Sequence, residues 1–243
     1  MENSELRGEN LVKNYGDKQV VCGVSITIRQ GEIMGLLGPN GAGKTTTFYM
    51  LTGIIKPSAG KVLLNGQDIS TWPLYRRARS GLCYLPQESS VFRSLTVLEN
   101  LKIILEHTGL SKAEQKKKAY ALMEEFGLTR LERSRASYLS GGERRRLEIA
   151  RSLVHDPKFI LLDEPFAGID PLAVNDIQGL IRGLKNRGIG VLISDHNARE
   201  TLSICDRASL MYQGSLILTG APDEIVASGE ARKNYLGDTF KMD

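Results

Sequence analysis

One local pattern constrains the fold of this chain more than any other: an apolar run, a glycine-rich loop and a helix-forming run in direct succession. Residues 33–37 are apolar, as in a strand buried on both faces. Residues 38–43 contain three glycines, and residues 44–51 favour a helix. A strand, a glycine loop and a helix in this order are typical of α/β proteins with a parallel sheet, so we expect that fold class.

The spacing within the loop fits phosphate binding. Gly38, Gly43, Lys44 and Thr45 match the pattern G-x-x-x-x-G-K-[ST], for which a chance match in this length is on the order of 1%. Glycines allow backbone N–H groups to point at phosphate oxygens, lysine contacts the β- and γ-phosphates, and the threonine hydroxyl contacts Mg²⁺. We therefore expect ATP and Mg²⁺ as ligands. The candidate loop residues are Gly38, Pro39, Asn40, Gly41, Ala42, Gly43, Lys44, Thr45 and Thr46.

Two carboxylates follow a second apolar run. Residues 159–162 are apolar, and Asp163 and Glu164 come directly after them. Because ligands of α/β sheets bind at the carboxyl ends of the strands, we expect this pair beside the phosphate loop. Alternate strand residues point to opposite faces, so the pair can divide its tasks. Asp163 would hold Mg²⁺ through water, and Glu164 would orient and polarise the attacking water.

A second glycine segment, Leu139–Glu143, precedes these carboxylates. Ser140 is a suitable helix N-cap, and Gly141 and Gly142 leave the first helical N–H groups open to an anion. On its own this segment fits a plain helix cap equally well. Its place in the chain, between the phosphate loop and the carboxylates, favours a second part of one nucleotide site.

Together these motifs resemble those of the ATP-binding-cassette (ABC) ATPases, over about residues 6–236. The resemblance rests on residues 38–46, Gln87, residues 139–143, residues 159–164, residues 168–170 and His196. It implies ATP hydrolysis and a head-to-tail homodimer. In that dimer, Lys44 of one copy and Ser140 of the other face the same γ-phosphate.

Further roles follow only from this resemblance. Tyr15 stands where the family stacks an aromatic ring on adenine, and Gln87 where a glutamine contacts Mg²⁺ and water. His196 corresponds to a histidine at the γ-phosphate, and Asp170 is both a candidate N-cap and a cross-subunit contact. The implied catalytic residues are Glu164, His196 and Gln87; the implied Mg²⁺ residues are Thr45, Gln87 and Asp163; and the implied nucleotide contacts outside the loop are Tyr15, Ser140, Gly141, Gly142, Glu143 and Asp170.

The implied architecture is an α/β P-loop NTPase of ABC type. It has a mostly parallel core sheet, an antiparallel β subdomain and an inserted α-helical subdomain. Local signals agree: residues 6–32 suggest short strands, Asn65-Gly66 a hairpin turn, and Thr96 and Ser111 begin capping boxes. We expect one ATP-binding domain over 5–237, with a RecA-like core at about 5–89 and 157–220, a helical subdomain at about 90–156, and a C-terminal tail over 221–243.

Composition argues against several other classes of protein. The net charge of +4 is weakly basic, and we expect no nucleic-acid partner. Residues 116–118 and 144–146 are expected on solvated helix faces, the arginines paired with Glu143 and Glu148. The three cysteines are isolated, which argues against a disulfide framework or metal cluster. No apolar stretch approaches the roughly 20 residues of a membrane helix, so membrane contact is expected only through partners.

Longer segments narrow the resemblance to the ATPase subunits of lipopolysaccharide export. These segments are 38–50, 84–88, 141–146, 162–171, 194–202 and 235–240. They imply a cytoplasmic, peripheral subunit on the inner membrane with two transmembrane partners of the LptF and LptG type. The ATPase subunit of a branched-chain amino-acid importer is the alternative. Phe92, an apolar residue in a polar loop, is the candidate contact for a partner helix, and a small local core is the competing explanation.

Overall fold

The computed structural model describes residues 4–242, apart from the side chains of residues 171 and 172. The strands are β1 (Glu5–Tyr15), β2 (Lys18–Arg29), β3 (Ile33–Leu37), β4 (Ala59–Leu64), β5 (Gln67–Asp68), β6 (Leu82–Leu85), β7 (Phe159–Asp163), β8 (Gly190–Ser194), β9 (Arg207–Tyr212) and β10 (Ser215–Gly220). The helices are α1 (Lys44–Thr52), α2 (Leu74–Arg79), α3 (Val97–Leu105), α4 (Lys112–Glu125), α5 (Gly141–Ser152), α6 (Pro171–Asn186), α7 (Ala198–Leu202), α8 (Pro222–Ala227) and α9 (Gly229–Ala231).

The central sheet has the strand order β10-β9-β3-β8-β7-β6. Neighbouring strands from β9 to β6 run parallel, and β10 pairs antiparallel with β9 at one edge. Every residue of β3, β7 and β8 is buried, because helices or the second sheet cover both faces of these strands. The expected mostly parallel core is confirmed, and each apolar run predicted as a buried strand forms one.

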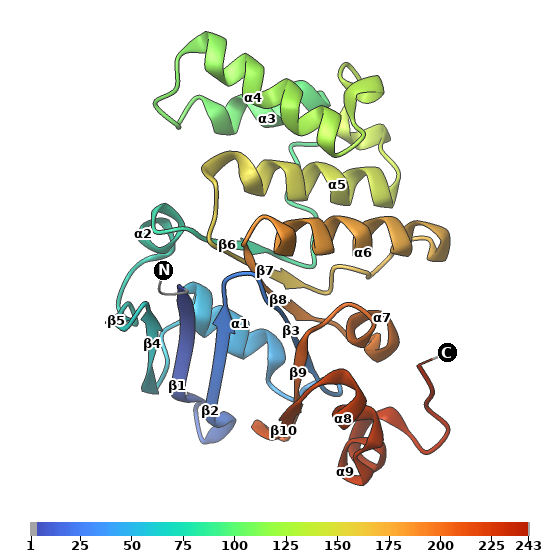
Figure 1. The fold of residues 1–243 in the computed structure, drawn as a ribbon. Helices are drawn as coiled ribbons and strands as arrows, with labels where there is room; N and C mark the ends of the chain where they lie inside the picture. Colours follow the sequence, from blue (N-terminus) through green and yellow to red (C-terminus); the bar gives the residue numbers. More distant parts are fainter. Residues whose placement is uncertain (1–3, 243) are drawn as a thin grey trace.

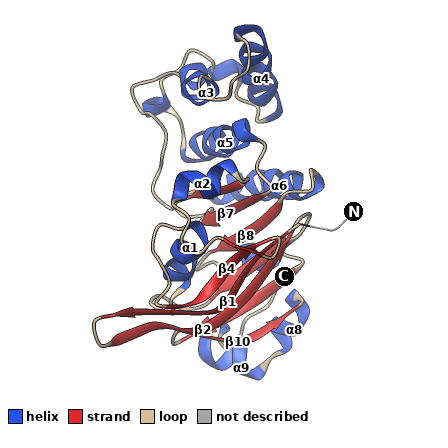
Figure 2. Ribbon diagram, turned by 90° about the vertical axis from the view of Figure 1, so that its left-hand side faces the viewer, coloured by secondary structure: helices blue, strands red, loops and turns tan. Residues whose placement is uncertain are grey.

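The second sheet is antiparallel, with the order β2-β1-β4-β5. The prediction of short strands over residues 6–32 is wrong: β1 has 11 residues and β2 has 12. Their hairpin extends past the neighbouring strands (Figure 2). Asn65 and Gly66 adopt φ angles of 52° and 76° between β4 and β5, the left-handed pair that an Asn-Gly hairpin turn requires.

Helices stack in order away from the central sheet: α6 first, then α5, and then the α3–α4 pair (Figure 1). Capping boxes begin α3 at Thr96, α4 at Ser111 and α5 at Ser140. One hydrophobic cluster runs through all of these layers, from Leu101 in α3 to Ile160 in β7. The α3–α4 pair is thus packed onto the central sheet through α5 and α6.

The interpretation of residues 144–146 as a solvated face is wrong for Arg145. Its side chain is 7% exposed and its Nη1 donates to a Glu148 carboxylate oxygen at 3.0 Å. Arg146 instead pairs with Asp176 of α6 at 3.3 Å. The middle arginine faces the core because α5 is covered on two sides, by α3 and by α6.

Within residues 4–242, we find no helix with the length and apolar character needed to cross a bilayer.

Candidate nucleotide-binding and catalytic site

The glycine loop between β3 and α1 wraps around a buried lysine. Lys44 is 6% exposed, and its Nζ donates to the carbonyl oxygens of Gly38 at 2.6 Å and Pro39 at 3.0 Å. Gly38 has φ 147° and Gly43 has φ 106°, conformations that favour glycine. A Cβ atom on Gly38 would lie 2.1 Å from the Met211 carbonyl oxygen, so only glycine allows this close approach.

Segments distant in the chain hold the loop in place. The turn between β9 and β10 donates from Gly214 N–H to the Ala42 carbonyl at 3.0 Å and accepts from Cys22 N–H at 2.8 Å. Within α1, the Thr47 hydroxyl donates to the Gly43 carbonyl at 3.0 Å. The loop therefore keeps its shape through contacts with β2, α1 and the β9–β10 turn.

Asp163 and Glu164 lie at the carboxyl end of β7, as expected, but strand alternation is not what directs their side chains apart. Asp163 ends the strand and is 4% exposed, whereas Glu164 lies beyond it with φ 46°. A left-handed turn, rather than strand alternation, thus sends the two carboxylates in different directions. The Glu164 N–H donates to the Ser194 carbonyl at 2.6 Å, which anchors this strained residue to β8.

Three predicted catalytic residues converge around the Glu164 carboxylate. The Gln87 Nε2 donates to Glu164 Oε2 at 2.8 Å, and His196 Nδ1 lies 3.3 Å from the same oxygen. Gln87 follows β6, Glu164 follows β7 and His196 follows β8, so three adjacent strands deliver them to one edge. Such an arrangement can orient a water molecule and accept its proton.

Burial opposes charge on the ionisable groups next to this edge. Burial lowers the pKa of Lys44, and the carboxylates of Glu164, Asp163 and Asp195 partly offset that effect. Burial likewise raises the pKa of Asp163, against hydrogen bonds from Ser194 and Tyr84. A bound nucleotide and cation would change this balance, because each buried group then gains a partner of opposite charge.

The structure adds contacts that sequence reasoning missed. The Tyr84 hydroxyl donates to Asp163 Oδ2 at 3.2 Å, and the Ser194 hydroxyl donates to Oδ1 at 3.1 Å. Asp195 is fully buried and accepts from the N–H groups of Phe166 and Asn197. A polar residue at the end of an apolar run was the available signal for Ser194 and Asp195, which follow residues 190–193. Tyr84 lies inside β6, before Leu85, so this signal did not mark it.

The C-terminal segment reaches the same edge of the sheet. The Tyr235 hydroxyl donates to the His196 carbonyl oxygen at 2.9 Å, across 39 residues of chain. Burial raises the pKa of Tyr235 to about 12, so the hydroxyl stays protonated and can donate. No local pattern around Tyr235 could have indicated this contact, because its partner is a backbone atom.

The oxygen donors of the predicted magnesium residues fit a cation that is bound together with phosphate. The residues that the structure describes contain no cluster of three or more His, Cys, Asp or Glu side chains able to hold a metal. Thr45, Gln87 and Asp163 instead offer a hydroxyl, an amide oxygen and a carboxylate, the hard oxygen ligands that Mg²⁺ prefers. Mg²⁺ usually takes only one or two protein ligands and completes its shell with phosphates and water.

The second glycine segment forms the start of α5. Ser140 accepts from the Glu143 N–H at 3.2 Å, and the Glu143 carboxylate accepts from the Ser140 N–H at 3.0 Å. A Cβ atom on Gly141 would lie 3.1 Å from the Gly168 carbonyl oxygen, so close packing against residues 168–173 also favours glycine here. In the described part of the chain, no hydrogen bond joins residues 139–143 to residues 38–46.

Gly141 shares a cleft of about 430 Å³ with Gln87 and Glu164. Ser140 and Gly141 are exposed, whereas Gly142 is buried. The start of α5 thus lies at the same cleft as the Glu164 carboxylate.

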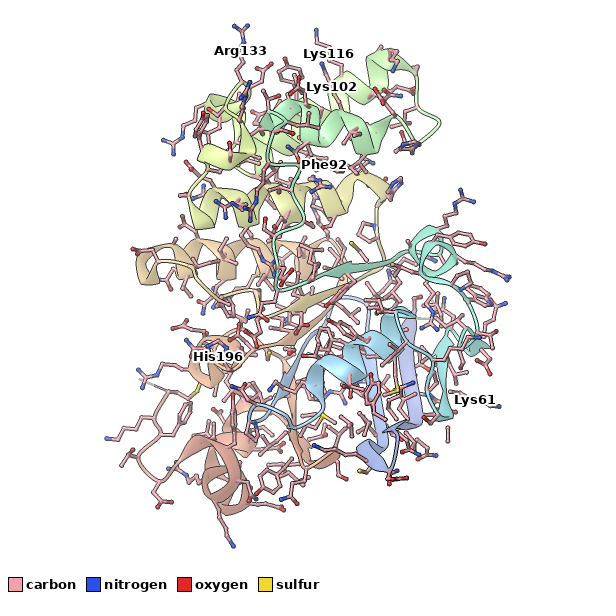
Figure 3. The ribbon with its side chains drawn as sticks, turned by 180° about the vertical axis from the view of Figure 1, so that it is seen from behind. Lys61, Phe92, Lys102, Lys116, Arg133 and His196 are labelled. Atoms are coloured by element: carbon pink, nitrogen blue, oxygen red, sulfur yellow. The ribbon has the colours of Figure 1, made fainter. Side chains whose placement is uncertain are left out.

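The remaining predicted residues, Tyr15, Asp170 and Phe92, are all exposed. Tyr15 is 51% exposed at the end of β1, and Asp170 directly precedes α6. Phe92 is 42% exposed, which does not fit a local core, and the Arg151 guanidinium lies 4.9 Å from its ring centroid. Buried Asn100 holds the Phe92 backbone through hydrogen bonds to its N–H and carbonyl. Figure 3 shows Phe92 on the half of the molecule near α5 and His196 on the other half.

Comparisons with known proteins agree with this geometry. A family model described as "ABC transporter" matches residues 21–167. The lipopolysaccharide export system ATP-binding protein LptB of Haemophilus influenzae is 51% identical, over 98% of this chain and all of that protein. The protein of the same name from Escherichia coli K12 is 52% identical, over 98% and 99%. A solved structure, the ADP conformation of MJ1267, an ATP-binding cassette of an ABC transporter, is 30% identical with a TM-score of 0.87 and covers 97% of this chain and 99% of that one.

Proposed function

Since this chain belongs to the ABC transporter family and is an ATPase coupled to transport, we propose that it powers lipopolysaccharide export. It would drive extraction of lipopolysaccharide from the inner membrane for delivery to the outer membrane. One observation carries this proposal: identity of 51–52% with two LptB proteins along nearly their entire lengths. The importer alternative is not favoured, because these relatives match the chain from end to end.

We infer the following division of tasks within one protomer. Lys44 and the loop N–H groups would bind the β- and γ-phosphates once Lys44 releases the carbonyls of Gly38 and Pro39. Thr45, Gln87 and Asp163 would hold Mg²⁺, which neutralises phosphate charge and aligns the reacting oxygens. Tyr15 would stack on the adenine ring.

Glu164 would orient the attacking water and accept its proton. Gln87 donates to one carboxylate oxygen of Glu164, which leaves the other oxygen for water. His196 Nδ1 lies 3.3 Å from that carboxylate, and His196 would also contact the γ-phosphate. The left-handed backbone of Glu164 supports this role, since strained conformations recur at catalytic residues.

The exposed start of α5 would serve a second copy of the chain. Ser140, Gly141, Gly142 and Glu143 would face the γ-phosphate held by Lys44 of the partner protomer, and Asp170 would add a contact across the interface. The open helix N-terminus supports this assignment, because it offers N–H groups and a positive dipole to an anion. A symmetric homodimer with two such sites would result.

We further propose two transmembrane partners of the LptF and LptG type, which would place the ATPase on the cytoplasmic face of the inner membrane. Phe92 would contact a cytoplasmic helix of a partner, and its exposed ring on a pinned backbone supports this role. The helical subdomain at about 90–156 and the tail at 221–243 would be functional units attached to the core at about 5–89 and 157–220.

Pull-down of detergent-solubilised partners tests the role of Phe92. Phe92→Ala should lose most partner binding, and Phe92→Leu should retain much of it because an apolar side chain remains. Both variants should melt at the temperature of the parent protein. Equal pull-down of the parent and Phe92→Ala would remove Phe92 from the partner interface.

Depletion of LptB in Escherichia coli tests the function itself. The present chain, expressed in the depleted cells, should restore growth and the arrival of newly made lipopolysaccharide at the outer membrane. Glu164→Gln is the matched negative control. Failure of the parent chain to restore export, although it binds and hydrolyses ATP, would contradict the lipopolysaccharide assignment. Restored branched-chain amino-acid uptake in an importer-deficient strain would support the alternative.

A further inference from the structure

Tyr84 in β6 has a specific place beside the proposed magnesium site. Its hydroxyl donates to Asp163 Oδ2 at 3.2 Å from the strand next to β7. Ser194, at the end of β8 on the other side of β7, donates to Asp163 Oδ1 at 3.1 Å. The buried carboxylate of Asp163 is therefore held at both oxygens, by one hydroxyl from each neighbouring strand.

The phenol also reaches toward the phosphate-loop helix. The rings of Tyr84 and Tyr49 meet edge to face, with centroids 6.1 Å apart and planes at 90°. Tyr49 belongs to α1, which begins with Lys44 and Thr45. Tyr84 thus connects β6, the strand that leads to Gln87, with both β7 and α1.

A tyrosine phenol is protonated at neutral pH, so the Tyr84 hydroxyl can donate its hydrogen bond to Asp163 Oδ2. An ionised carboxylate offers about four lone-pair positions, of which two hydroxyl donors occupy two. The remaining positions point away from Tyr84 and Ser194. Fixing a carboxylate in this way reduces its rotation, as partners of metal ligands commonly do.

We propose that Tyr84 is a positioning residue for Mg²⁺, which holds the Asp163 carboxylate in the orientation that receives a cation-bound water. The inference rests on the proposed role of Asp163 and deepens it. Tyr84 itself touches neither nucleotide nor cation. Loss of its hydroxyl frees the Asp163 carboxylate to rotate. We expect this to weaken cation binding and to leave nucleotide affinity without the cation unchanged.

Tyr84→Phe is a sharp test because it keeps the ring and its contact with Tyr49 and removes only the hydroxyl. The measurement uses the full chain carrying Glu164→Gln, in the presence of ATP, with Mn²⁺ in place of Mg²⁺. Electron paramagnetic resonance of free Mn²⁺ then gives cation affinity without any turnover. We expect Tyr84→Phe to weaken Mn²⁺ binding roughly 10-fold, the lower end of the effect of removing a metal ligand's partner.

Two further variants separate positioning from general damage. Ser194→Ala frees the other carboxylate oxygen and should weaken Mn²⁺ binding by a similar factor. Tyr75→Phe is the control: it removes a phenol hydroxyl from an exposed ring of α2 and should change Mn²⁺ affinity less than about 2-fold. ATP affinity measured in EDTA, and the melting temperature, should be the same in Tyr84→Phe and the parent.

The outcomes distinguish this inference from the proposed function. Mn²⁺ binding by Tyr84→Phe within 2-fold of the parent, while Asp163→Ala abolishes it, would overturn the role of Tyr84 alone. Unchanged Mn²⁺ binding by Asp163→Ala would overturn the magnesium role of Asp163 and this inference with it. Equal weakening of ATP affinity in EDTA would show that the hydroxyl shapes the phosphate loop rather than the cation site, which also contradicts the proposal.

Discussion

The two glycine-rich segments differ in how completely their own chain surrounds them. The phosphate loop is enclosed: Lys44 is buried, its ammonium has carbonyl partners, and β2, α1 and the β9–β10 turn hold the loop. The start of α5 is open: Ser140 is exposed, and its side chain hydrogen-bonds with Glu143 in the capping box. One chain therefore encloses the phosphate loop by itself, whereas its second glycine segment stays exposed.

Glu164→Gln should have the largest effect on ATP hydrolysis, because it removes the proposed general base and leaves the start of α5 unchanged. Hydrolysis should fall roughly 10²- to 10⁴-fold while ATP still binds. The variant should then accumulate as an ATP-bound dimer, measured by light scattering after gel filtration. Only monomers under these conditions would argue against a site shared between protomers, and turnover equal to wild type would remove Glu164 from its role.

Mixing two inactive variants tests whether the open segment acts on the partner's nucleotide. Lys44→Ala should lose nucleotide binding and Ser140→Ala should lose turnover, yet a mixed dimer retains one intact composite site. Random exchange should restore about a quarter of wild-type ATPase sites. Steady-state hydrolysis after mixing measures the recovery.

The control for this mixture pairs Lys44→Ala with Glu164→Gln. Both residues belong to the enclosed part of the same protomer, so no mixed dimer contains an intact site and no recovery is expected. Recovery in this control, or its absence with Ser140→Ala, would show that the two segments do not act across protomers.

Substitution of Arg77 tests how strongly the end of α1, the helix that follows the phosphate loop, is anchored. Its fully buried guanidinium donates to the Met50 and Leu51 carbonyls at the end of α1, and to Ser70 and Trp72. Burial lowers the pKa of Arg77 to about 10, so it stays charged at neutral pH. Arg77→Met leaves several buried carbonyls without donors and should lower the free energy of unfolding by about 3 kcal/mol.

Urea denaturation followed by circular dichroism measures this loss. Arg76→Met is the matched control, because Arg76 is exposed and stacks on Trp72 with its Cζ 4.0 Å from the ring centroid. It should cost less than about 1 kcal/mol. Similar losses for the two variants would mean that Arg77 does not anchor α1.

Acid should have the smallest effect on stability. It should act in opposite directions on the capped helices α3, α4 and α5 and on the ends of strands β7 and β8. Capping hydrogen bonds from Thr96, Ser111 and Ser140 lower the pKa values of Glu99, Glu114 and Glu143 below 4.5. Their contribution to stability is complete above pH 4.5 and is lost as pH falls through the lowered values. Burial raises the pKa values of Asp163 and Asp195 above 3.8, so their protonated forms favour the fold in acid and that contribution is lost as pH rises.

Hydrogen exchange measured by mass spectrometry at pH values below 4.5 can compare the regions. After correction for intrinsic rates, amides of α3, α4 and α5 should lose protection before those of β7 and β8. Glu114→Gln should reduce the pH dependence in α4 and leave that of the sheet unchanged. Equal loss of protection in both regions would indicate a single cooperative unit without separate acid sensitivity.

Much of the architecture could be predicted because its signals are local. Asn65-Gly66 forms the expected left-handed turn, the three capping boxes form where Thr or Ser precedes Glu by three residues, and the apolar runs become buried strands. Strand ends also brought Gln87, Glu164 and His196 together, as parallel topology requires. In each case the deciding atoms lie within a few residues of one another or at equivalent ends of parallel strands.

The sequence by itself therefore determined the order of strands, loops and helix caps, and the chemistry at each strand end. Tertiary structure alone decided that Arg145 is buried, that Glu164 turns away from Asp163 through a left-handed backbone, and that Tyr84 reaches Asp163. It also decided that the start of α5 packs against residues 168–173. The reason is physical: a backbone conformation depends on adjacent residues, whereas burial and hydrogen-bond partners depend on which distant parts of the chain meet.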